Sequence, residues 1–392
     1  MIKKKAVAQI CIIVLITLVL CASGFVILMW YLFEYTGNLQ YYEFENIREI
    51  EAKGDTLVWI TETGDCYVSG GYETTGSVKY ANTEHKNYMA KNVPKPVKCF
   101  DGGAKRAVIC DNLLLIISET KKLYSVSDKG TKLLAEGVLG AVQVDNGEFC
   151  YIDEAGNLIK ITSEENHVKI AEKVSKIQVC DQWIFILYNN GKLIAYDKKF
   201  TDNLRYSNYI CSDVRDFEAV KNSLRYDSVK GYYDLDGDIS ERVTITLLDH
   251  ENNLYVKGSY SLLYNRHKLF TDIIPPVKEY KEFTLIAESV EYFKSSSMGT
   301  VIRHSDGQIA YFGNNTSWES DPWVGYMDLE LNDIIDIDIA ASMIYALTEE
   351  GVIYCWGSND EAQYKLHQID DIENNVRDDP ACIFDPRVFR LK

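Results

Sequence analysis

The fold of this chain is decided by the stretch Thr348-Glu349-Glu350-Gly351-Val352-Ile353-Tyr354-Cys355-Trp356-Gly357-Ser358-Asn359. Just before it, residues 335–340 alternate isoleucine with aspartate or alanine, and a period of two is typical of a β-strand. A second strand is predicted over residues 343–347, followed by a turn at Gly351 and a third strand that ends in Trp-Gly. Glycine suits this turn because it adopts a positive φ angle without steric cost.

The same phrase occurs six more times along the chain. Four of these copies keep glycine at the turn, namely Gly64, Gly156, Gly191 and Gly307. Asn252 stands at the turn of a fifth copy, and asparagine is the best substitute for glycine at a positive φ angle. Lys121 stands there in the weakest copy. The chain therefore contains seven copies of one hairpin.

These repeats predict an all-β fold. Residues 34–392 allow about 51 residues for each of the seven copies, which is the size of one four-stranded propeller blade. One copy cannot bury both of its faces, whereas seven copies in a closed ring can. We therefore expect a seven-bladed β-propeller over residues 47–392. We also expect strand material between residues 382 and 391 to pair with residues 41–50 and close the ring.

The last repeat resembles a known family. Residues 334–366, with Ala346-Leu347-Thr348, Trp356-Gly357 and Gln363, are similar to the regulator-of-chromosome-condensation repeat. The copy that ends at Asn314 has Tyr-Phe-Gly in place of Trp-Gly, and the first five copies show the resemblance only faintly. The resemblance implies a seven-bladed propeller and suggests a bacterial, membrane-anchored relative. It does not imply the exchange-factor activity of the nuclear members, because fold alone does not transmit function.

The N-terminus differs from the rest of the chain. Residues 6–33 carry no charge, and about 20 apolar residues are enough to cross a bilayer. Three lysines precede this run, so residues 1–5 are expected in the cytoplasm and everything after Phe33 outside it. The expected order is a transmembrane helix over residues 6–33, a juxtamembrane linker over residues 34–46 and the propeller.

The N-terminal run has two alternative interpretations, a cleaved signal peptide and a lipoprotein signal. A signal peptidase could cleave near Ala22-Ser23-Gly24, but residues 25–33 stay apolar beyond that point. A lipoprotein needs a small residue before its cysteine, and Leu20 precedes Cys21. We favour an uncleaved, single-pass anchor in the cell membrane.

Charge and motifs argue against several function classes. The formal net charge of −17 disfavours binding to nucleic-acid phosphate, and an exported domain is not expected to meet a GTPase. The six histidines form no motif, and the chain lacks zinc-protease, serine-hydrolase and phosphate-loop signatures. The ten cysteines include no Cys-x-x-Cys pair, so no disulfide or zinc site can be assigned from the sequence.

One acidic cluster is a candidate calcium loop. Its ligands would be Asp234, Asp236, Asp238 and Glu241. Alternating carboxylates around a glycine suit a hard cation, because their oxygens converge in a tight turn. Two residues depart from calcium-loop patterns, since Ile239 replaces a glycine and Arg242 replaces a carboxylate. The alternative is a solvated acidic turn without metal. No other cofactor is expected.

The acidic cluster lies in an insertion. About twenty residues, 221–242, separate two predicted strands that are close together in the other copies. The insertion and a second loop after Asn314 hold aromatic residues that suit contacts with protein or carbohydrate, namely Tyr226, Tyr232, Tyr233, Trp318, Trp323 and Tyr326. The alternative is that these side chains fill the packing between blades.

The sequence therefore favours a non-enzymatic binding scaffold outside the cytoplasm, with an envelope protein or glycan as its partner. The alternative is an envelope enzyme acting on glycans or peptides, with carboxylates such as Asp336 and Asp338 near a propeller channel. Clustered carboxylates with raised pKa values would favour the enzyme, and an apolar channel lining would favour the scaffold.

Overall fold

The computed structural model describes residues 46–53, 56–70, 97–110, 113–127, 130–145, 147–163, 166–198, 207–221, 226–227, 232–233, 243–260, 279–314, 324–329, 333–340, 343–358 and 376–384. All of them belong to one compact unit, Glu45–Pro386. The expected transmembrane segment, residues 6–33, lies outside the described residues. Within the described part, no helix is long and apolar enough to cross a membrane.

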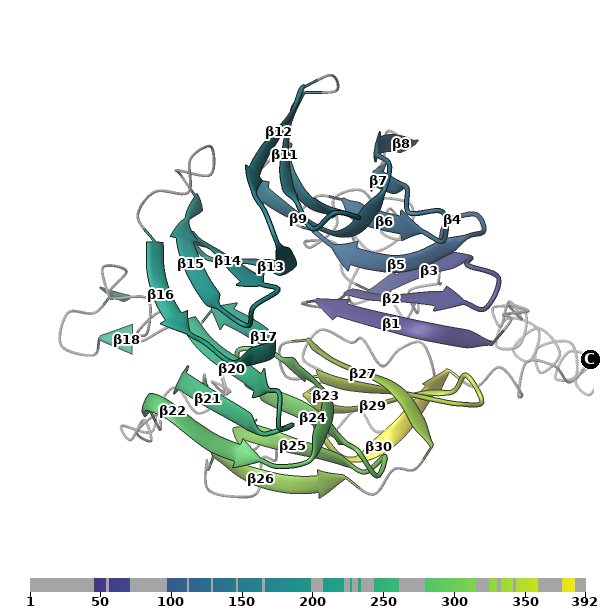
Figure 1. Cartoon of the computed structure of the whole chain (residues 1–392). Coiled ribbons are helices and arrows are strands. Elements are labelled where there is room, and N and C mark those ends of the chain that lie inside the picture. The colour runs from purple at the N-terminus through teal and green to yellow at the C-terminus, as the bar shows by residue number, and fades with distance from the viewer. Residues whose placement is uncertain are drawn as a thin grey trace, which may run out of the picture. The chain divides into compact units, whose positions relative to one another are not determined.

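Seven antiparallel four-stranded sheets, here called blades, follow one another along the chain (Figure 1). Blade 1 consists of β1 (Ile47–Lys53), β2 (Thr56–Thr61), β3 (Cys66–Gly70) and β4 (Val97–Phe100). Blade 2 consists of β5 (Ala104–Ile109), β6 (Leu114–Ser118), β7 (Leu123–Ser127) and β8 (Gly130–Ala135). Blade 3 consists of β9 (Val138–Asp145), β10 (Glu148–Asp153), β11 (Leu158–Ser163) and β12 (Asn166–Ala171). Blade 4 consists of β13 (Val174–Cys180), β14 (Trp183–Tyr188), β15 (Leu193–Asp197) and β16 (Ser207–Cys211).

The last three blades repeat this order. Blade 5 consists of β17 (Val214–Lys221), β20 (Val243–Asp249), β21 (Leu254–Ser259) and β22 (Glu279–Ala287). A two-stranded hairpin of β18 (Tyr226–Asp227) and β19 (Tyr232–Tyr233) lies within the predicted insertion. Blade 6 consists of β23 (Val290–Ser295), β24 (Gly299–His304), β25 (Ile309–Asn314) and β26 (Val324–Leu329). Blade 7 consists of β27 (Ile334–Ala340), β28 (Met343–Thr348), β29 (Ile353–Ser358) and β30 (Val376–Phe384).

The blades form a closed ring. The first strand of each blade is its inner strand, and inner strands of successive blades contact one another from β9 through β13, β17 and β23 to β27. The inner strand β27 of the last blade also contacts β1 of the first blade. The predicted seven-bladed β-propeller is therefore confirmed.

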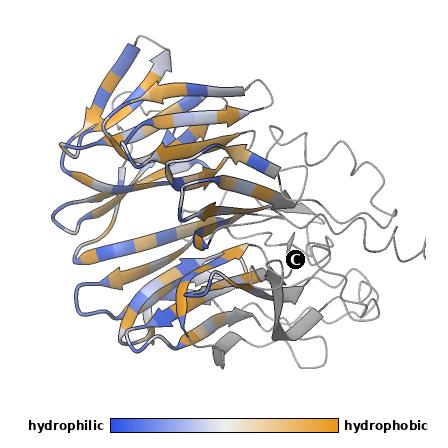
Figure 2. Cartoon of the chain, turned by 90° about the vertical axis from the view of Figure 1, so that its right-hand side faces the viewer, coloured by the Kyte–Doolittle hydropathy of each residue, from blue (hydrophilic) through white to orange (hydrophobic). Residues whose placement is uncertain are grey.

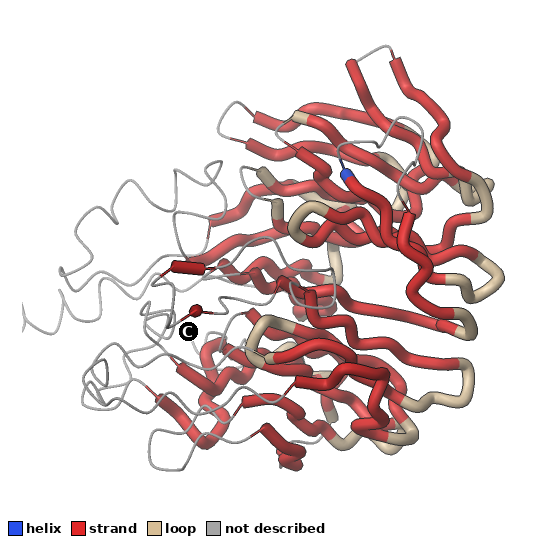
Figure 3. The backbone as a smooth tube through the Cα atoms, turned by 90° about the vertical axis from the view of Figure 1, so that its left-hand side faces the viewer, coloured by secondary structure: helices blue, strands red, loops and turns tan. Residues whose placement is uncertain are grey.

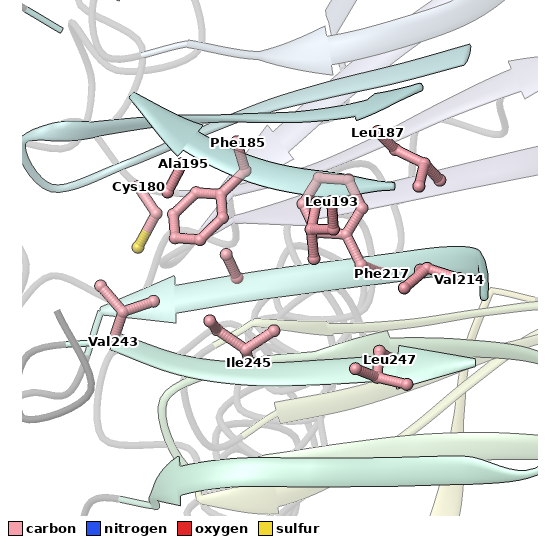
Figure 4. Close-up of a cluster of buried hydrophobic side chains, with 11 residues drawn as sticks. Cys180, Phe185, Leu187, Leu193, Ala195, Val214, Phe217, Val243, Ile245 and Leu247 are labelled. Carbon is pink, nitrogen blue, oxygen red and sulfur yellow. The ribbon is translucent and has the colours of Figure 1, made fainter. Parts of the chain in front are cut away.

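Apolar side chains between neighbouring blades hold the ring together. Between blades 4 and 5, Phe185 and Leu193 pack against Phe217, Val243 and Ile245, and all five are nearly inaccessible to solvent (Figure 4). Figure 2 shows the apolar residues distributed along the strands of every blade it colours. Burial of this surface supplies most of the favourable free energy of folding.

The repeated turn phrase has one backbone conformation in every blade. It joins the second and third strands, and its third residue has a positive φ angle in all seven copies: Gly64, Lys121, Gly156, Gly191, Asn252, Gly307 and Gly351. The φ angles of Lys121 (58°) and Asn252 (68°) show that the two copies without glycine keep the same turn. The prediction of a positive φ angle at this position is confirmed.

The turns also link each blade to the next. The Gly191 carbonyl of blade 4 accepts a hydrogen bond of 3.0 Å from the Val214 amide, which begins blade 5. Equivalent bonds join Gly64 to Ala104 and Gly156 to Val174. In the tightest case, a Cβ atom added to Gly64 would lie 2.4 Å from the Gly103 nitrogen, so the first turn requires glycine.

The prediction for ring closure is wrong. The strand β30 does include the expected residues 382–384, but it pairs with β29 inside the last blade. The strand β1 pairs with β2 inside the first blade, not with the C-terminal segment. No blade shares strands from both ends of the described chain. The ring closes by side-by-side packing of complete blades instead.

The two faces of the ring differ in their connections. Because antiparallel strands alternate in direction, links from second to third strands and from blade to blade lie on one face, here the turn face. Links from first to second and from third to fourth strands lie on the opposite face, here the loop face. Described turns gather along one side of the ring in Figure 3. The longest connections all belong to the loop face: residues 71–96, 198–206, 222–242, 260–278, 315–323 and 359–375.

Candidate functional site

The inner strands carry a repeated pattern that the turn phrase does not reveal. Each begins with a β-bulge near its second residue, as between Val214 and Asp216. Two positions then flank a deeply buried residue, as Asp216 and Glu218 flank Phe217. The flanking pairs are Glu49 and Glu51, Arg106 and Val108, Gly140 and Val142, Lys176 and Gln178, Asp216 and Glu218, Tyr292 and Lys294, and Asp336 and Asp338.

Nine ionisable side chains at these positions form what we call the central charge cluster: Glu49, Glu51, Arg106, Lys176, Asp216, Glu218, Lys294, Asp336 and Asp338. They come from six of the seven inner strands. The seventh, β9, contributes Gly140 and Val142 instead. Lys294 of blade 6 interacts electrostatically with Glu218 and Asp338 of the neighbouring blades 5 and 7, and also with Glu51 of blade 1, which is not a neighbour. The cluster therefore faces the middle of the ring.

Lys176 is bound on one side of the cluster. Its ammonium group lies 2.8 Å from Asp216 Oδ1 and 3.0 Å from Glu218 Oε1, and it donates a hydrogen bond of 2.7 Å to the Phe217 carbonyl. Burial alone would lower the pKa of Lys176, but the carboxylates of Glu218 and Asp216 outweigh burial and raise it. Lys176 is therefore a charged tether between blades 4 and 5.

Gln178 completes this tether. Its amide nitrogen donates to Glu218 Oε2 at 2.8 Å, and its amide oxygen accepts a hydrogen bond of 2.8 Å from the Ala219 amide. Both partners belong to β17 of the next blade. The polar groups on β13 thus hold the neighbouring inner strand by its backbone as well as by its side chains.

Lys294 and Arg106 are the other two cations of the cluster. Lys294 Nζ lies 3.3 Å from Glu51 Oε2, across the middle of the ring. Burial would lower the pKa of Lys294, yet Glu51, Tyr292, Asp338 and Glu218 together hold it well above its usual value. Burial likewise opposes the charge of Arg106, and Glu51 and Glu49 raise its pKa. Each cation is thus stabilised by at least two carboxylates.

Asp336 and Asp338 join the last blade to the first. Asp336 Oδ2 accepts a hydrogen bond of 2.9 Å from the Ile50 amide, and Asp338 Oδ2 accepts one of 2.6 Å from the Ala52 amide. The second oxygen of each carboxylate accepts an amide hydrogen bond from its own strand. Burial raises the pKa of Asp336 to about 6 and that of Asp338 well above its usual value.

Glu49 is a third cluster carboxylate with a raised pKa. Burial, and next the Asp336 carboxylate, raise its pKa to about 7, while Arg106 acts in the opposite direction. A carboxylic acid with such a pKa can exchange protons near neutral pH, which is the property that the enzyme alternative requires. The inner strands thus carry clustered carboxylates with raised pKa values. Most residues at these positions are charged, and few of them are apolar or small.

The predicted calcium ligands Asp234, Asp236, Asp238 and Glu241 lie outside the described residues. Among the residues that the structure does describe, no group of three or more histidine, cysteine, aspartate or glutamate side chains is placed to hold a metal ion. The calcium loop therefore stays a prediction.

The predicted partner-binding aromatics are placed only in part. The insertion lies between β17 and β20 as predicted, and the backbones of Tyr226 and Tyr233 pair in its small hairpin, beside Tyr232. Trp318 and Trp323 lie outside the described residues. Tyr326 belongs to β26, where its backbone pairs with Phe312. The predicted second loop therefore ends at residue 323, before Tyr326. The insertion and the connection of residues 315–323 both belong to the loop face.

Sequence reasoning missed most of the central charge cluster. It named Asp336 and Asp338 but treated them as catalytic candidates, and it overlooked Glu49, Lys176 and Lys294. A signal was present, because in six of the seven blades at least one charged residue flanks the apolar residue three positions after the blade begins. That alignment becomes visible only when the inner strands are superposed by their turns.

Comparisons with known proteins do not assign this chain to a family. No family model matches it, and no curated protein matches it. Solved structures do match. Prp20p from Saccharomyces cerevisiae, reported with its binding to Gsp1p and histones, is 12% identical, with 86% of this chain and 77% of that chain covered and a TM-score of 0.45.

Two further solved propellers are similar at the same level. The Cps50 (Swd1) β-propeller domain of Myceliophteria thermophila is 11% identical, with 80% of this chain and 96% of that chain covered and a TM-score of 0.48. BamB from Moraxella catarrhalis is 11% identical, with 79% and 84% covered and a TM-score of 0.37. Our assignment of the seven-bladed fold rests on the sheets themselves.

Proposed function

We propose that this protein is a membrane-anchored interaction scaffold whose propeller lies outside the cytoplasm and binds an envelope protein or glycan through its loop face. The observation that carries the proposal is the separation of short and long connections. All seven links between second and third strands are four-residue turns on the turn face. Every connection of nine residues or more opens from the loop face. Long connections on a rigid frame are where binding surfaces are commonly built.

The point where the chain enters the propeller agrees with this division. The Asn46 carbonyl accepts a hydrogen bond of 2.7 Å from the Glu62 amide in the first turn, so the chain reaches β1 from the turn face. The strand β30 ends at Phe384, which pairs with Ile353 beside the last turn. Both ends of the described chain thus belong to the turn face, and neither is attached to the loop face.

The raised pKa values in the central charge cluster are a property that an enzyme would need, but the hydrogen bonds of its two aspartates favour the scaffold. An enzyme with two carboxylates needs them free to reach a substrate. Asp336 and Asp338, the candidates for that role, each accept one amide hydrogen bond from their own strand and one from β1. Lys176 and Lys294 form ion pairs with the other carboxylates of the cluster. These contacts suit a frame that fixes the inner strands, and Glu49 is the residue on which the enzyme alternative now depends.

The identity of the family is part of the proposal. Residues 334–366 carry the regulator-of-chromosome-condensation repeat most clearly, and their described part, up to Ser358, forms the first three strands of blade 7. We propose that the chain is a bacterial, membrane-anchored member of that family that reuses the propeller for binding. No GTPase or nucleic-acid partner is proposed, because the net charge is −17 and we propose that the propeller lies outside the cytoplasm.

The proposal can be tested on the insertion of blade 5. Replacing residues 224–231 with a Gly-Ser linker removes β18 and the loop before β19 but leaves β17 and β20 paired. We expect the full-length variant to lose a partner that wild-type protein retains from envelope extract, while its thermal unfolding stays cooperative. The matched control replaces residues 199–204, a loop-face connection of blade 4, with a linker of equal length.

Two outcomes would contradict the proposal. If both variants retain the partner, the insertion is not the binding site. If purified wild-type protein hydrolyses an envelope glycan or peptide and Glu49→Gln stops the reaction, the protein is an enzyme. Protease added to intact cells tests location separately, because it should digest the propeller and leave a short membrane stub.

A further inference from the structure

Two cysteines meet on neighbouring strands of blade 1. Cys66 begins β3, and Cys99 lies on β4, where a register shift places an extra residue opposite Cys66 and Tyr67. This bulge turns Cys99 toward the same apolar cluster that contains Cys66. The Cys99 thiol donates a hydrogen bond of 3.3 Å to the Cys66 carbonyl. Both side chains therefore pack against the same apolar cluster, and the Cys99 thiol reaches the backbone of Cys66.

The surroundings of the two thiols differ. Cys66 is completely buried among Val58, Ile60 and Ala104, whereas Cys99 is only partly buried at the edge of the blade. The neighbouring Cys99 thiol, together with burial, holds the pKa of Cys66 well above its usual value. The Cys99 thiol is therefore partly accessible to a reagent, whereas the Cys66 thiol is buried next to it.

We propose that Cys66 and Cys99 form a disulfide that fastens the outer strand β4 to β3 when the propeller meets an oxidising compartment. The inference rests on the extracytoplasmic location proposed above. Neighbouring cysteines on antiparallel strands can satisfy the geometry of a disulfide without large backbone movement. Disulfides persist outside the cytoplasm and are rare inside it.

The oxidant is a second disulfide, supplied by an exchange protein or by oxidised glutathione. The Cys99 thiolate attacks one sulfur of the donor, which forms a mixed disulfide and releases one donor thiol. The Cys66 thiolate then attacks the Cys99 sulfur, which forms the Cys66–Cys99 bond and releases the second donor thiol. Two thiols lose their protons and are oxidised, and one donor disulfide is reduced to two thiols.

The bond would enclose the longest connection of the loop face, because it joins the turn-face ends of the two strands that this connection links. Residues 71–96 join β3 to β4, and β4 is a short strand of four residues at the edge of its blade. Without the bond, β4 is held by its backbone pairing with β3 and by ion pairs of Lys98 with Asp65 and Asp101. Closing a loop of this size restricts the unfolded chain and stabilises the folded one.

Full-length protein isolated from its membrane without reductant provides the test. Free thiols are alkylated, and the protein is digested with trypsin. Cleavage after Lys98 and Lys105 leaves Cys99 in a peptide of residues 99–105, separate from Cys110 and Cys66. We expect this peptide to be joined to the Cys66 peptide and to be released by reduction. We also expect Cys99→Ala to lower the melting temperature by on the order of 5 °C without reductant and by little with it.

Cys211→Ala is the matched control, because Cys211 is also a partly buried cysteine on an outer strand, opposite Leu193. It should change the melting temperature equally with and without reductant. A parallel sample of fully reduced protein is unfolded and refolded with oxidised glutathione. If the linked peptide does not form there, the pairing is wrong. If it forms there while both thiols are free in protein taken from cells, the pairing is supported and the extracytoplasmic location is wrong.

Discussion

The Asp338 carboxylate accepts a hydrogen bond from the Ala52 amide at 2.6 Å, across the boundary between the last blade and the first. Two residues earlier on the same strand, the Asp336 carboxylate accepts a hydrogen bond from the Ile50 amide. These bonds join blade 7 to blade 1. In propellers whose closing blade contains strands from both chain ends, backbone pairing within that blade makes the same connection. A side-chain carboxylate on one inner strand satisfies backbone donors of the next, and the ring closes between two complete sheets.

Asp338→Ala should therefore weaken closure. The substitution leaves the Ala52 and Ile339 amides without their acceptor, and each unsatisfied buried amide costs about 1–3 kcal/mol. We expect a loss of roughly 2–4 kcal/mol in the free energy of unfolding, measured by denaturant titration. Asp338→Asn keeps one acceptor oxygen and should lose less. Glu62→Ala, in an exposed turn, is the control. Equal stability of Asp338→Ala and the control would show that the contact does not hold the ring.

Removal of residues 381–392 should lower the melting temperature for a different reason. The deletion takes away the part of β30 that pairs with residues 353–355 of β29 and uncovers that edge. It leaves β27 against β1, so amide hydrogen exchange at Ile50 and Ala52 should stay slow. Faster exchange at these two amides, with an unchanged rate in blade 4, would mean that the tail closes the ring after all.

The repeated turns allow steric and conformational costs to be separated. Gly64 and Gly307 hold the same turn position with φ angles of 81° and 85°. An added Cβ meets the Gly103 nitrogen at 2.4 Å in the first case and nothing within 4 Å in the second. Gly307→Ala should cost about 1 kcal/mol for the left-handed backbone alone, and Gly64→Ala roughly 2–4 kcal/mol because overpacking adds to it. Equal losses in thermal unfolding would contradict this reasoning.

Glu49 should make the protein less stable as pH rises toward neutrality. Its pKa is raised from 4.5 to about 7, so the native state keeps a proton that the unfolded chain has already released. The resulting stabilisation is complete below pH 4.5 and is lost as pH rises through about 7. Asp336, raised to about 6, acts with the same sign.

Glu49→Gln tests this dependence. Melting temperatures at about pH 5.5 and 7.5 bracket the raised pKa. The variant should lose less stability than the wild type between these two conditions, because glutamine does not titrate. The charged groups that face Glu49 from other residues, Asp336, Glu51, Arg106 and Lys294, are present in both proteins. An identical drop in the variant would assign the pH dependence to Asp336 or Asp338.

The acidic loop of blade 5 gives a metal prediction. If Asp234, Asp236 and Asp238 bind calcium together with Glu241, calorimetry on full-length protein should show one site, and Asp236→Ala should abolish it. The control is Asp306→Ala, on a turn of blade 6. An absence of heat at millimolar calcium would assign the loop to the class of solvated acidic turns.

The sequence alone determined the number of blades and the conformation of their turns. Both are local properties, because each turn requires a residue that tolerates a positive φ angle and each strand alternates side chains across one sheet. Lys121 and Asn252 also have positive φ angles, because the hairpin on either side of them is the same as in the other copies. The place of the insertion between β17 and β20 followed from the same spacing.

Only the tertiary structure decided how the ring closes and what the inner strands do. Asp336 lies 286 residues from Ile50, and Glu51 lies 243 residues from Lys294, yet both pairs are in contact. No local sequence pattern specifies such partners, because they depend on how the seven inner strands are arranged around the axis of the ring. The approach of Cys99 to Cys66 has the same origin. It depends on a bulge in β4 that places one thiol over another, and the intervening residues 71–96 give no sign of it in the sequence.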